Sequence, residues 1–367
     1  MNKSYLVLAM LAAFTGNAQA QSNVTVFGSF DGGVRYQNNV DANGSSKVTM
    51  NSTGTQNSNR LGFRGTEELG GGLQARFLLE SGFNSGNGTL DNPAKLFNRS
   101  AFVGLASKWG SVDVGRQYTV GFKTILGYDP FNFKYPLIVP LALGASGGIR
   151  FDNDIQYTGT FGPMTLRAEW ALGEQAGSGR DNAARSLGLS YLQGPLSFGG
   201  SYTLRRPNVA AATGAPSFRE NRHFTLGGAY KFLKVRLAGG YAQEDQDLLA
   251  GSTRQKNAWF GGSMNLNLFT DLTAAYYDTR VENISGGSTD GKRELVMVGV
   301  TYALSKRTLL YTNVDYARFK DGLALPVGVT GLPAGNFLAG GSNLLALTSA
   351  PGQNSQTGVS IGISHSF

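Results

Sequence analysis

Residue types that commonly carry catalysis are scarce in this sequence. Among its 367 residues there are only two histidines, His223 and His365, and no cysteine. No Ser or Asp arrangement around His223 repeats a known catalytic spacing, and no paired His or Cys offers the spacing of zinc ligands. The glycines at 70–72 indicate a turn and not a phosphate-binding loop. The sequence therefore predicts no enzyme, no metal site and no cofactor.

Several arginines alternate with apolar residues, a clearer pattern than the two histidines show. Arg60 lies on the opposite face of its segment from Leu61, and Arg150 lies opposite Phe151. Such alternation is typical of a β-strand with one polar and one apolar face. The same test adds two further candidates for the polar face, Arg64 and Arg76. Although the formal net charge is +8, the cations form no basic run that would indicate a nucleic-acid partner.

The elements that would hold these arginines are predicted to be β-strands. Charged residues make up 15% of the chain, against about 25% in a typical soluble domain, and 52 residues are glycine. The mean hydropathy is −0.16. Beyond the N-terminus, no segment approaches the run of about 20 apolar residues that a membrane helix needs. The composition therefore favours a glycine-rich all-β protein over a helical one.

Period-2 alternation recurs along the chain and predicts about 16 strands. It is clearest at the C-terminus, where Val359, Ile361 and Ile363 share one face and the aromatic Phe367 ends the chain on that face. A terminal aromatic residue on such a strand is typical of outer-membrane barrels. The predicted strands cover 23–36, 58–67, 72–83, 98–106, 110–117, 150–160, 163–172, 184–192, 195–206, 219–230, 234–244, 256–265, 268–279, 292–303, 308–319 and 356–367.

The first twenty residues predict a secretory signal peptide. Lys3 supplies a positive start, residues 5–14 are apolar, and Ala18-Gln19-Ala20 fits the small-x-small cleavage pattern. The apolar stretch is too short to cross a bilayer. We therefore expect residues 1–20 to be removed on export and residues 21–367 to form the mature domain.

Short and long connections between the predicted strands alternate. This rhythm is typical of an outer-membrane barrel, which has tight periplasmic turns and long external loops. A soluble β-sandwich is the alternative, but its connections would be of similar length on both sides. Because backbone groups in lipid must pair within the protein, the sheet would have to close. We therefore predict an all-β fold, a 16-stranded antiparallel transmembrane β-barrel wide enough for an aqueous channel.

One connection, at about 118–149, is much longer than the rest of the pattern predicts. It holds the apolar run PLIVPLAL at 136–143, which an external loop would expose to water. We therefore expect this segment to fold into the barrel, with a mobile external loop as the alternative. Asp129 is the only Asp or Glu between Arg116 and Phe151, so the loop is nearly free of acidic groups.

Several stretches of the chain resemble the trimeric general-diffusion porins of the Gram-negative outer membrane, and most closely their β-proteobacterial branch. The matching segments are VTVFGSFDGGV at 24–34, NRLGFRGTEELGGGLQARFLLE at 59–80, RSAFVGLASKWGSVDVGRQY at 99–118, RFDNDIQYTGTFGPM at 150–164 and the terminal GISHSF. The resemblance implies a 16-stranded barrel whose third loop folds inward to form a constriction, with wall cations facing acidic groups on that loop.

The resemblance also implies roles for individual residues. The wall arginines of the constriction would be Arg60, Arg99 and Arg150, and Asp129 would be the facing acid. Arg116 shares the parity of the apolar face, which places it at a subunit contact or a bulge. Where some members of the family carry a lysine on the first strand, this chain has Ser29, with Asp31 two residues later.

From these observations we expect an outer-membrane pore for passive diffusion of small hydrophilic solutes and ions, with mild anion selectivity. The implied partners are two further copies in a homotrimer, the lipid bilayer and lipopolysaccharide, and small anions. A substrate-specific channel is the main alternative, since the aromatic loop could form a binding track. A barrel enzyme or an adhesin is a third class, which the missing catalytic constellation and the weakly charged external loops do not favour.

Overall fold

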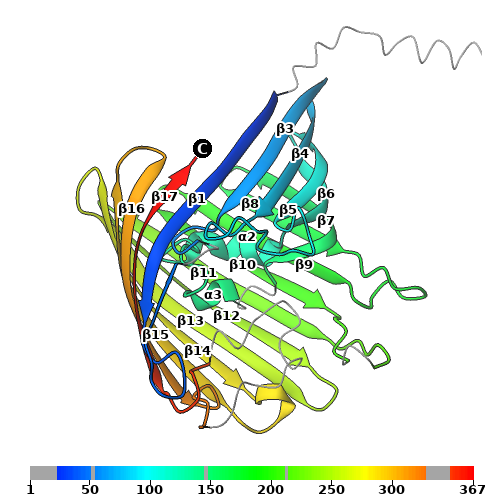
Figure 1. Cartoon of the computed structure of the whole chain (residues 1–367). Coiled ribbons are helices and arrows are strands. Elements are labelled where there is room, and N and C mark those ends of the chain that lie inside the picture. The colour runs from blue at the N-terminus through cyan, green and yellow to red at the C-terminus, as the bar shows by residue number, and fades with distance from the viewer. Residues whose placement is uncertain (1–22, 51–53, 144–147, 211–213, 328–347) are drawn as a thin grey trace, which may run out of the picture.

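The chain folds as a closed antiparallel β-barrel in the computed structural model (Figure 1). The structure describes residues 23–50, 54–143, 148–210, 214–327 and 348–367, so the predicted signal peptide at 1–20 lies outside the described residues. The strands are β1 Asn23–Gln37, β2 Lys47–Met50, β3 Arg60–Gly70, β4 Leu73–Gly82, β5 Ser100–Ser107, β6 Gly110–Tyr118, β7 Arg150–Phe161, β8 Met164–Ala171, β9 Ala184–Gln193, β10 Leu196–Arg205, β11 Asn221–Phe232, β12 Val235–Asp247, β13 Ser252–Asn265, β14 Thr270–Glu282, β15 Gly291–Ala303, β16 Thr308–Asp321 and β17 Ser355–Ser366.

The first strand closes the barrel by pairing on both of its sides. The stretch of β1 from Asn23 to Ser29 pairs with β3, and the stretch from Ser29 to Gln37 pairs with β17. The four-residue strand β2 adds to the end of β1 alone. The other sixteen strands of the 17-stranded sheet form the wall, which confirms the predicted 16-stranded barrel. Strand β2 was not predicted, because four residues within a polar loop are too few for alternation to stand out.

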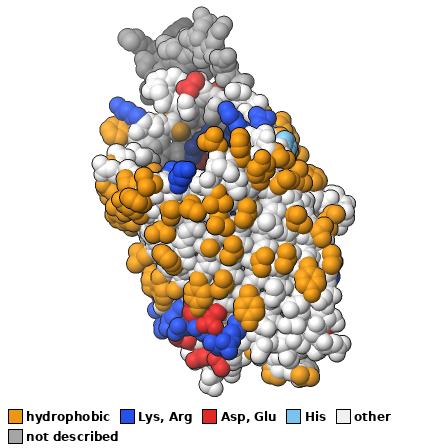
Figure 2. All heavy atoms as spheres, turned by 90° about the vertical axis from the view of Figure 1, so that its left-hand side faces the viewer, with side chains coloured by type: hydrophobic (Ala, Val, Ile, Leu, Met, Phe, Trp, Pro, Cys, Tyr) orange, Lys and Arg blue, Asp and Glu red, His pale blue; other side chains and the backbone are white. Residues whose placement is uncertain are grey.

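The two faces of the wall differ in polarity as the alternation predicted. On β17, Val359, Ile361 and Ile363 are exposed on the outside, while Ser360 and Ser364 are buried on the inside. Figure 2 shows hydrophobic side chains spread in a band over the outer wall, with a group of Lys, Arg, Asp and Glu beyond its lower edge and further Lys and Arg near its upper edge. Such a band, flanked by polar ends, is what a lipid-facing barrel surface requires.

The helical elements of the described chain are short and lie mostly in the connection between β6 and β7. They are α2 Val120–Ile125, the 3₁₀ turn η1 Leu126–Tyr128 and α3 Pro140–Leu143, and a further 3₁₀ turn, η2 Ile284–Gly286, follows β14. Thr119 caps α2, since its side chain accepts a hydrogen bond from the backbone N–H of Phe122. In the part of the chain that the structure describes, no helix has the length and apolar character needed to cross a membrane.

The connection between β6 and β7, called the third loop below, packs against the inner face of the barrel (Figure 1). Tyr135, Val139 and Leu141 are almost completely buried. They belong to one cluster with side chains of β12 to β16, among them Trp259, Tyr277, Leu295, Met297 and Phe319. The apolar run therefore avoids water by covering an apolar patch of the inner wall, and the loop occupies part of the lumen.

Glycines on the wall make room for the start of this loop. A side chain at Gly227 would place its Cβ 2.7 Å from Tyr128, and one at Gly188 would come within 2.6 Å of Val120. Both distances are shorter than van der Waals contact allows. The glycine-rich composition thus has a local use here, because α2 and η1 lie directly on the backbone of β9 and β11.

Candidate pore constriction

The three arginines implied by the family motifs line one cavity inside the barrel. Arg60 is the first residue of β3, Arg99 directly precedes β5, and Arg150 is the first residue of β7. All three border a space of about 590 Å³. Lys123 and Lys134 of the third loop face the same cavity. The structure therefore brings together five cations, three from the wall and two from the loop, with one acid, Asp91, on the same lining.

Tyr118, at the end of β6, holds two of these arginines in place. Its hydroxyl oxygen accepts a hydrogen bond from Nη2 of Arg99 at 2.7 Å and another from Nη2 of Arg150 at 2.7 Å. The guanidinium carbon of Arg150 also lies 4.3 Å from the centre of the Tyr118 ring, within cation–π range. Nε of Arg99 pairs with Oε1 of Glu80 at 2.5 Å. Arg99 is therefore neutralised, whereas the charge of Arg150 meets a neutral phenol.

The side chain of Arg99 lies inside the barrel, although the alternation of polar and apolar residues around it does not indicate which face it occupies. The strand β5 begins one residue later, at Ser100, so Arg99 does not follow the alternation of that strand. Its side chain turns inward to Glu80 and is only 7% exposed. The motif identified this position, and strand parity could not.

The positive charge of Arg60 on the wall acts on Lys134 in the third loop. Burial and the nearby positive charge of Arg60 lower the pKa of Lys134 to about 8, while Asp31 opposes the shift. Burial also lowers the pKa of Lys123. Lys134 is thus held where positive charge is already concentrated, which makes the cavity more attractive to an anion, whereas the carboxylates of Asp113, Glu169 and Asp154 act on Lys123.

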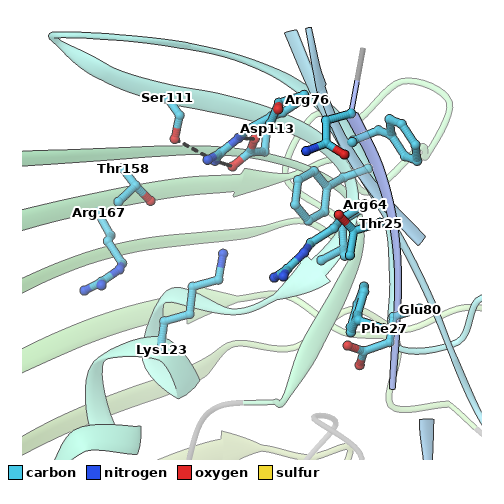
Figure 3. A pocket seen from close by; sticks show the side chains of 16 residues that line it. Thr25, Phe27, Arg64, Arg76, Glu80, Ser111, Asp113, Lys123, Thr158 and Arg167 are labelled. Atoms are coloured by element: carbon cyan, nitrogen blue, oxygen red, sulfur yellow. Dashed lines mark hydrogen bonds and ion pairs between the residues drawn. The ribbon is translucent and has the colours of Figure 1, made fainter. Parts of the chain in front are cut away.

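Arg64 and Arg76 line a second cavity, of about 600 Å³, nearer the short turns (Figure 3). Nε of Arg76 pairs with Oδ1 of Asp113 at 2.8 Å, and its Nη2 donates to the hydroxyl of Ser111 at 2.7 Å. Arg76 is therefore neutralised. The guanidinium carbon of Arg64 lies 5.3 Å from the centre of the Phe27 ring. Lys123 borders both cavities, so the two spaces meet at this side chain.

Asp129 does not face the arginines, contrary to the expectation for the acidic loop residue. It is completely buried against the opposite wall. The hydroxyl of Tyr277 donates to its Oδ1 at 2.6 Å, and the backbone N–H of Phe133 donates to its Oδ2 at 2.7 Å. An Asp followed by Pro favours the start of a turn, where the carboxylate accepts local backbone donors. Burial raises the pKa of Asp129 to about 6.

Arg116 lies at a break in strand pairing. The register between β6 and β7 shifts between Gly115 and Gln117, so Arg116 occupies a bulge. Its Nε donates to the backbone oxygen of Asn98 at 2.6 Å, and its Nη1 pairs with Asp152 at 2.5 Å. The structure therefore separates Arg116 from the cavity of the three arginines, as its parity indicated.

The first loop, which connects β1 to β3, also enters the barrel and lies beside the third loop. Asp31 of β1 is fully buried, and its carboxylate accepts the backbone N–H of Thr55 at 2.8 Å and of Asn57 at 3.1 Å. The N–H of Tyr135 in the third loop donates to the backbone oxygen of Gln56 at 2.9 Å. Asn57 and the adjacent Ser58 line the arginine cavity. Asp31 thus holds part of the first loop inside the lumen.

The lysines of the third loop are functional candidates that the sequence reasoning missed. Between 119 and 149 the charged residues are Lys123, Asp129 and Lys134. The scarcity of acids in this loop predicts a positive constriction, and its two lysines are the signal in the sequence that identifies the cations themselves. Arg167 on β8, which lines the second cavity, was also missed, although it alternates with apolar neighbours.

Comparison with known proteins gives this geometry a family. A closed barrel with an apolar outer face and cations around its interior is the architecture of a membrane channel. Residues 7–322 match the family model described as Gram-negative porin, so the chain belongs to the Gram-negative porin family. It is accordingly an outer-membrane porin.

Individual relatives agree with this assignment over nearly their whole length. The chain is 34% identical to an outer membrane porin protein of Bordetella pertussis, with 90% of this chain and 98% of that protein covered. It is 33% identical to outer membrane porin protein 32 of Delftia acidovorans, with 100% of both chains covered. Among solved structures, the anion-selective porin from Comamonas acidovorans is 29% identical and matches with a TM-score of 0.75, covering 95% of this chain and 100% of that one.

Proposed function

We propose that this porin is a mildly anion-selective pore for small hydrophilic solutes, with its constriction at the cavity of Arg60, Arg99 and Arg150. The observation that carries the proposal is the placement of charge around that cavity. Two loop lysines face the same space as the wall arginines, whereas the only acid of the loop, Asp129, is buried elsewhere. Rings of like charge in a low-dielectric frame favour ions of opposite sign. The similar porin from Comamonas acidovorans is described as anion-selective, which supports the same preference here.

The reversal potential in a salt gradient across a planar bilayer tests this selectivity. We expect the wild-type protein to prefer chloride over potassium. The double variant Arg60→Glu/Arg150→Glu should move the reversal potential towards cations, because it replaces by acids two cations of the cavity that form no ion pair within the described residues. Arg180→Glu, on an exposed loop, is the matched control and should leave it unchanged. A cation-preferring wild type, or a double variant that behaves like the control, would contradict the proposal.

We further propose that three copies assemble as a homotrimer in contact with lipid and lipopolysaccharide. Arg116, Asp152 and Lys95 form a charged group at the bulge of β6, and Asp152 and Lys95 are 49% and 41% exposed there. A neighbouring subunit can therefore reach this group. Light scattering of the purified protein, corrected for bound detergent, measures the assembly. A mass of one subunit would contradict it.

A further inference from the structure

The second cavity combines features that a general diffusion pore does not need. Its inner wall carries an apolar strip of Phe27, Leu78 and Phe102. Leu78 and Phe102 are direct partners on β4 and β5, and Leu78 also pairs with Arg64 on β3. All three apolar side chains remain partly exposed inside the barrel. A contiguous apolar patch that faces water often marks a ligand-binding site.

Three cations line the same space, with Arg64 beside the strip and Lys123 and Arg167 on the other side of the cavity (Figure 3). Arg64 stacks near Phe27, Nζ of Lys123 donates to Oε1 of Gln117 at 3.2 Å, and Nη1 of Arg167 lies 3.4 Å from the hydroxyl of Ser190. In the described part of the chain, none of these three forms an ion pair with a carboxylate. They are therefore available to an anionic ligand.

The acids that line this cavity are already paired. Asp113 pairs with Arg76, and Glu80 pairs with Arg99. An entering carboxylate would thus meet three cations with neutral partners and two carboxylates whose charge is already balanced. The volume of about 600 Å³ lies within the range of about 300–1,000 Å³ typical of small-molecule sites.

We propose that this cavity is a binding subsite for aromatic carboxylates, meaning a single ring that bears a carboxylate group. The ring covers the strip of Phe27, Leu78 and Phe102, and the carboxylate lies among Arg64, Lys123 and Arg167. Lys123 borders both cavities, so an anion can be passed from the wall arginines to this subsite without leaving positive charge. The inference rests on the proposed anion-selective pore and adds a preferred class of solute to it.

Single-channel recording of the full-length protein tests the subsite with benzoate, acetate and the uncharged ring compound benzamide as probes. We expect benzoate to interrupt the current for about threefold to tenfold longer than acetate, a ratio that an aromatic contact supplies. Benzamide should cause no resolved interruption. The variant Phe102→Ser should shorten the benzoate interruptions to those of acetate, and Arg167→Gln should shorten them as well.

Controls separate this inference from the proposed function. Two control variants should retain the benzoate interruptions. They are Phe232→Ser, on the outside of the barrel at the last residue of β11, and Arg180→Gln, on an exposed loop. Unchanged conductance in potassium chloride shows that Phe102→Ser has folded, and Leu78→Thr replaces it if it has not. Equal interruptions by benzoate and acetate in an anion-selective wild type would overturn the subsite alone. A cation-selective wild type would overturn the proposed function itself.

Discussion

Lys134 gives the constriction a charge that can be removed near neutral pH. Its pKa is lowered to about 8 by burial and by Arg60, so the side chain is charged below that pH and neutral above it. Since the arginines keep their charge throughout this range, the anion preference should fall, but not vanish, as the pH rises from 7 to 9. The reversal potential measured at several pH values checks this expectation.

The variant Lys134→Gln isolates the contribution of this side chain. It should lower the anion preference at pH 7 and reduce the change between pH 7 and 9. The anion preference that remains at both pH values is expected from the wall arginines, which stay charged. Lys47→Gln, on the exposed strand β2, is the charge-matched control. An identical pH profile for Lys134→Gln and Lys47→Gln would show that Lys134 does not face the ion path.

Strand parity located the wall cations well, and it failed where a side chain left the strand pattern. Arg60, Arg64, Arg76 and Arg150 were placed by alternation, and all line lumen cavities. Asp129 was misplaced because a loop residue has no parity. Its position depends on a turn and on Tyr277, which lies 148 residues away in sequence. Pairwise contacts at that separation cannot be predicted from one sequence.

At the scale of elements, the hydrogen bonds that Asp31 accepts hold the first loop in the barrel. Removing its carboxylate in Asp31→Ala leaves the N–H groups of Thr55 and Asn57 without their acceptor, at a cost of about 1–3 kcal/mol for each group that stays buried. The loop should therefore move outward and take Asn57 away from the constriction. We expect larger single-channel conductance and permeation of larger neutral sugars in a liposome swelling assay.

Asp41 offers a matched control within the same loop. Its carboxylate also accepts two backbone N–H groups, those of Asn43 at 2.9 Å and Ser45 at 3.0 Å, but the site is exposed to water. Asp41→Ala should leave conductance unchanged, because water replaces the lost acceptor. Equal conductance of Asp31→Ala and wild type would argue that the first loop does not limit the pore.

The two inward loops differ in how much of their fold the sequence predicted. The third loop carries the run at 136–143, whose apolar content requires burial, and the sequence predicted that it enters the barrel. The first loop is polar at 54–59, which resembles an exposed connection. Its burial depends on Asp31 and on the backbone of the third loop. Composition predicts burial driven by apolar surface, but it does not reveal burial driven by hydrogen bonds.

At the scale of the whole molecule, closure of the barrel is reinforced by an ion pair that crosses a strand. Arg35 on β1 makes two hydrogen bonds to Asp315 on β16, at 2.7 and 2.8 Å, and both side chains are nearly buried. The strand β17 lies between them, and a side chain at Gly358 would collide with the guanidinium of Arg35. The glycine therefore lets the arginine of the first strand reach past the last one.

Breaking this pair should destabilise the barrel more than replacing it. Arg35→Leu or Asp315→Leu alone leaves a buried charge without its partner, which costs about 3–5 kcal/mol. Asp315→Leu should be the more severe change, because Asn313 also donates to Asp315 at 3.0 Å. The double variant Arg35→Leu/Asp315→Leu removes both charges and should recover much of the loss. Urea unfolding in detergent micelles, followed by tryptophan fluorescence, measures the free energies for all four proteins. If the losses of the two single variants simply add in the double variant, the pair does not act as a unit across β17, and closure rests on backbone pairing alone.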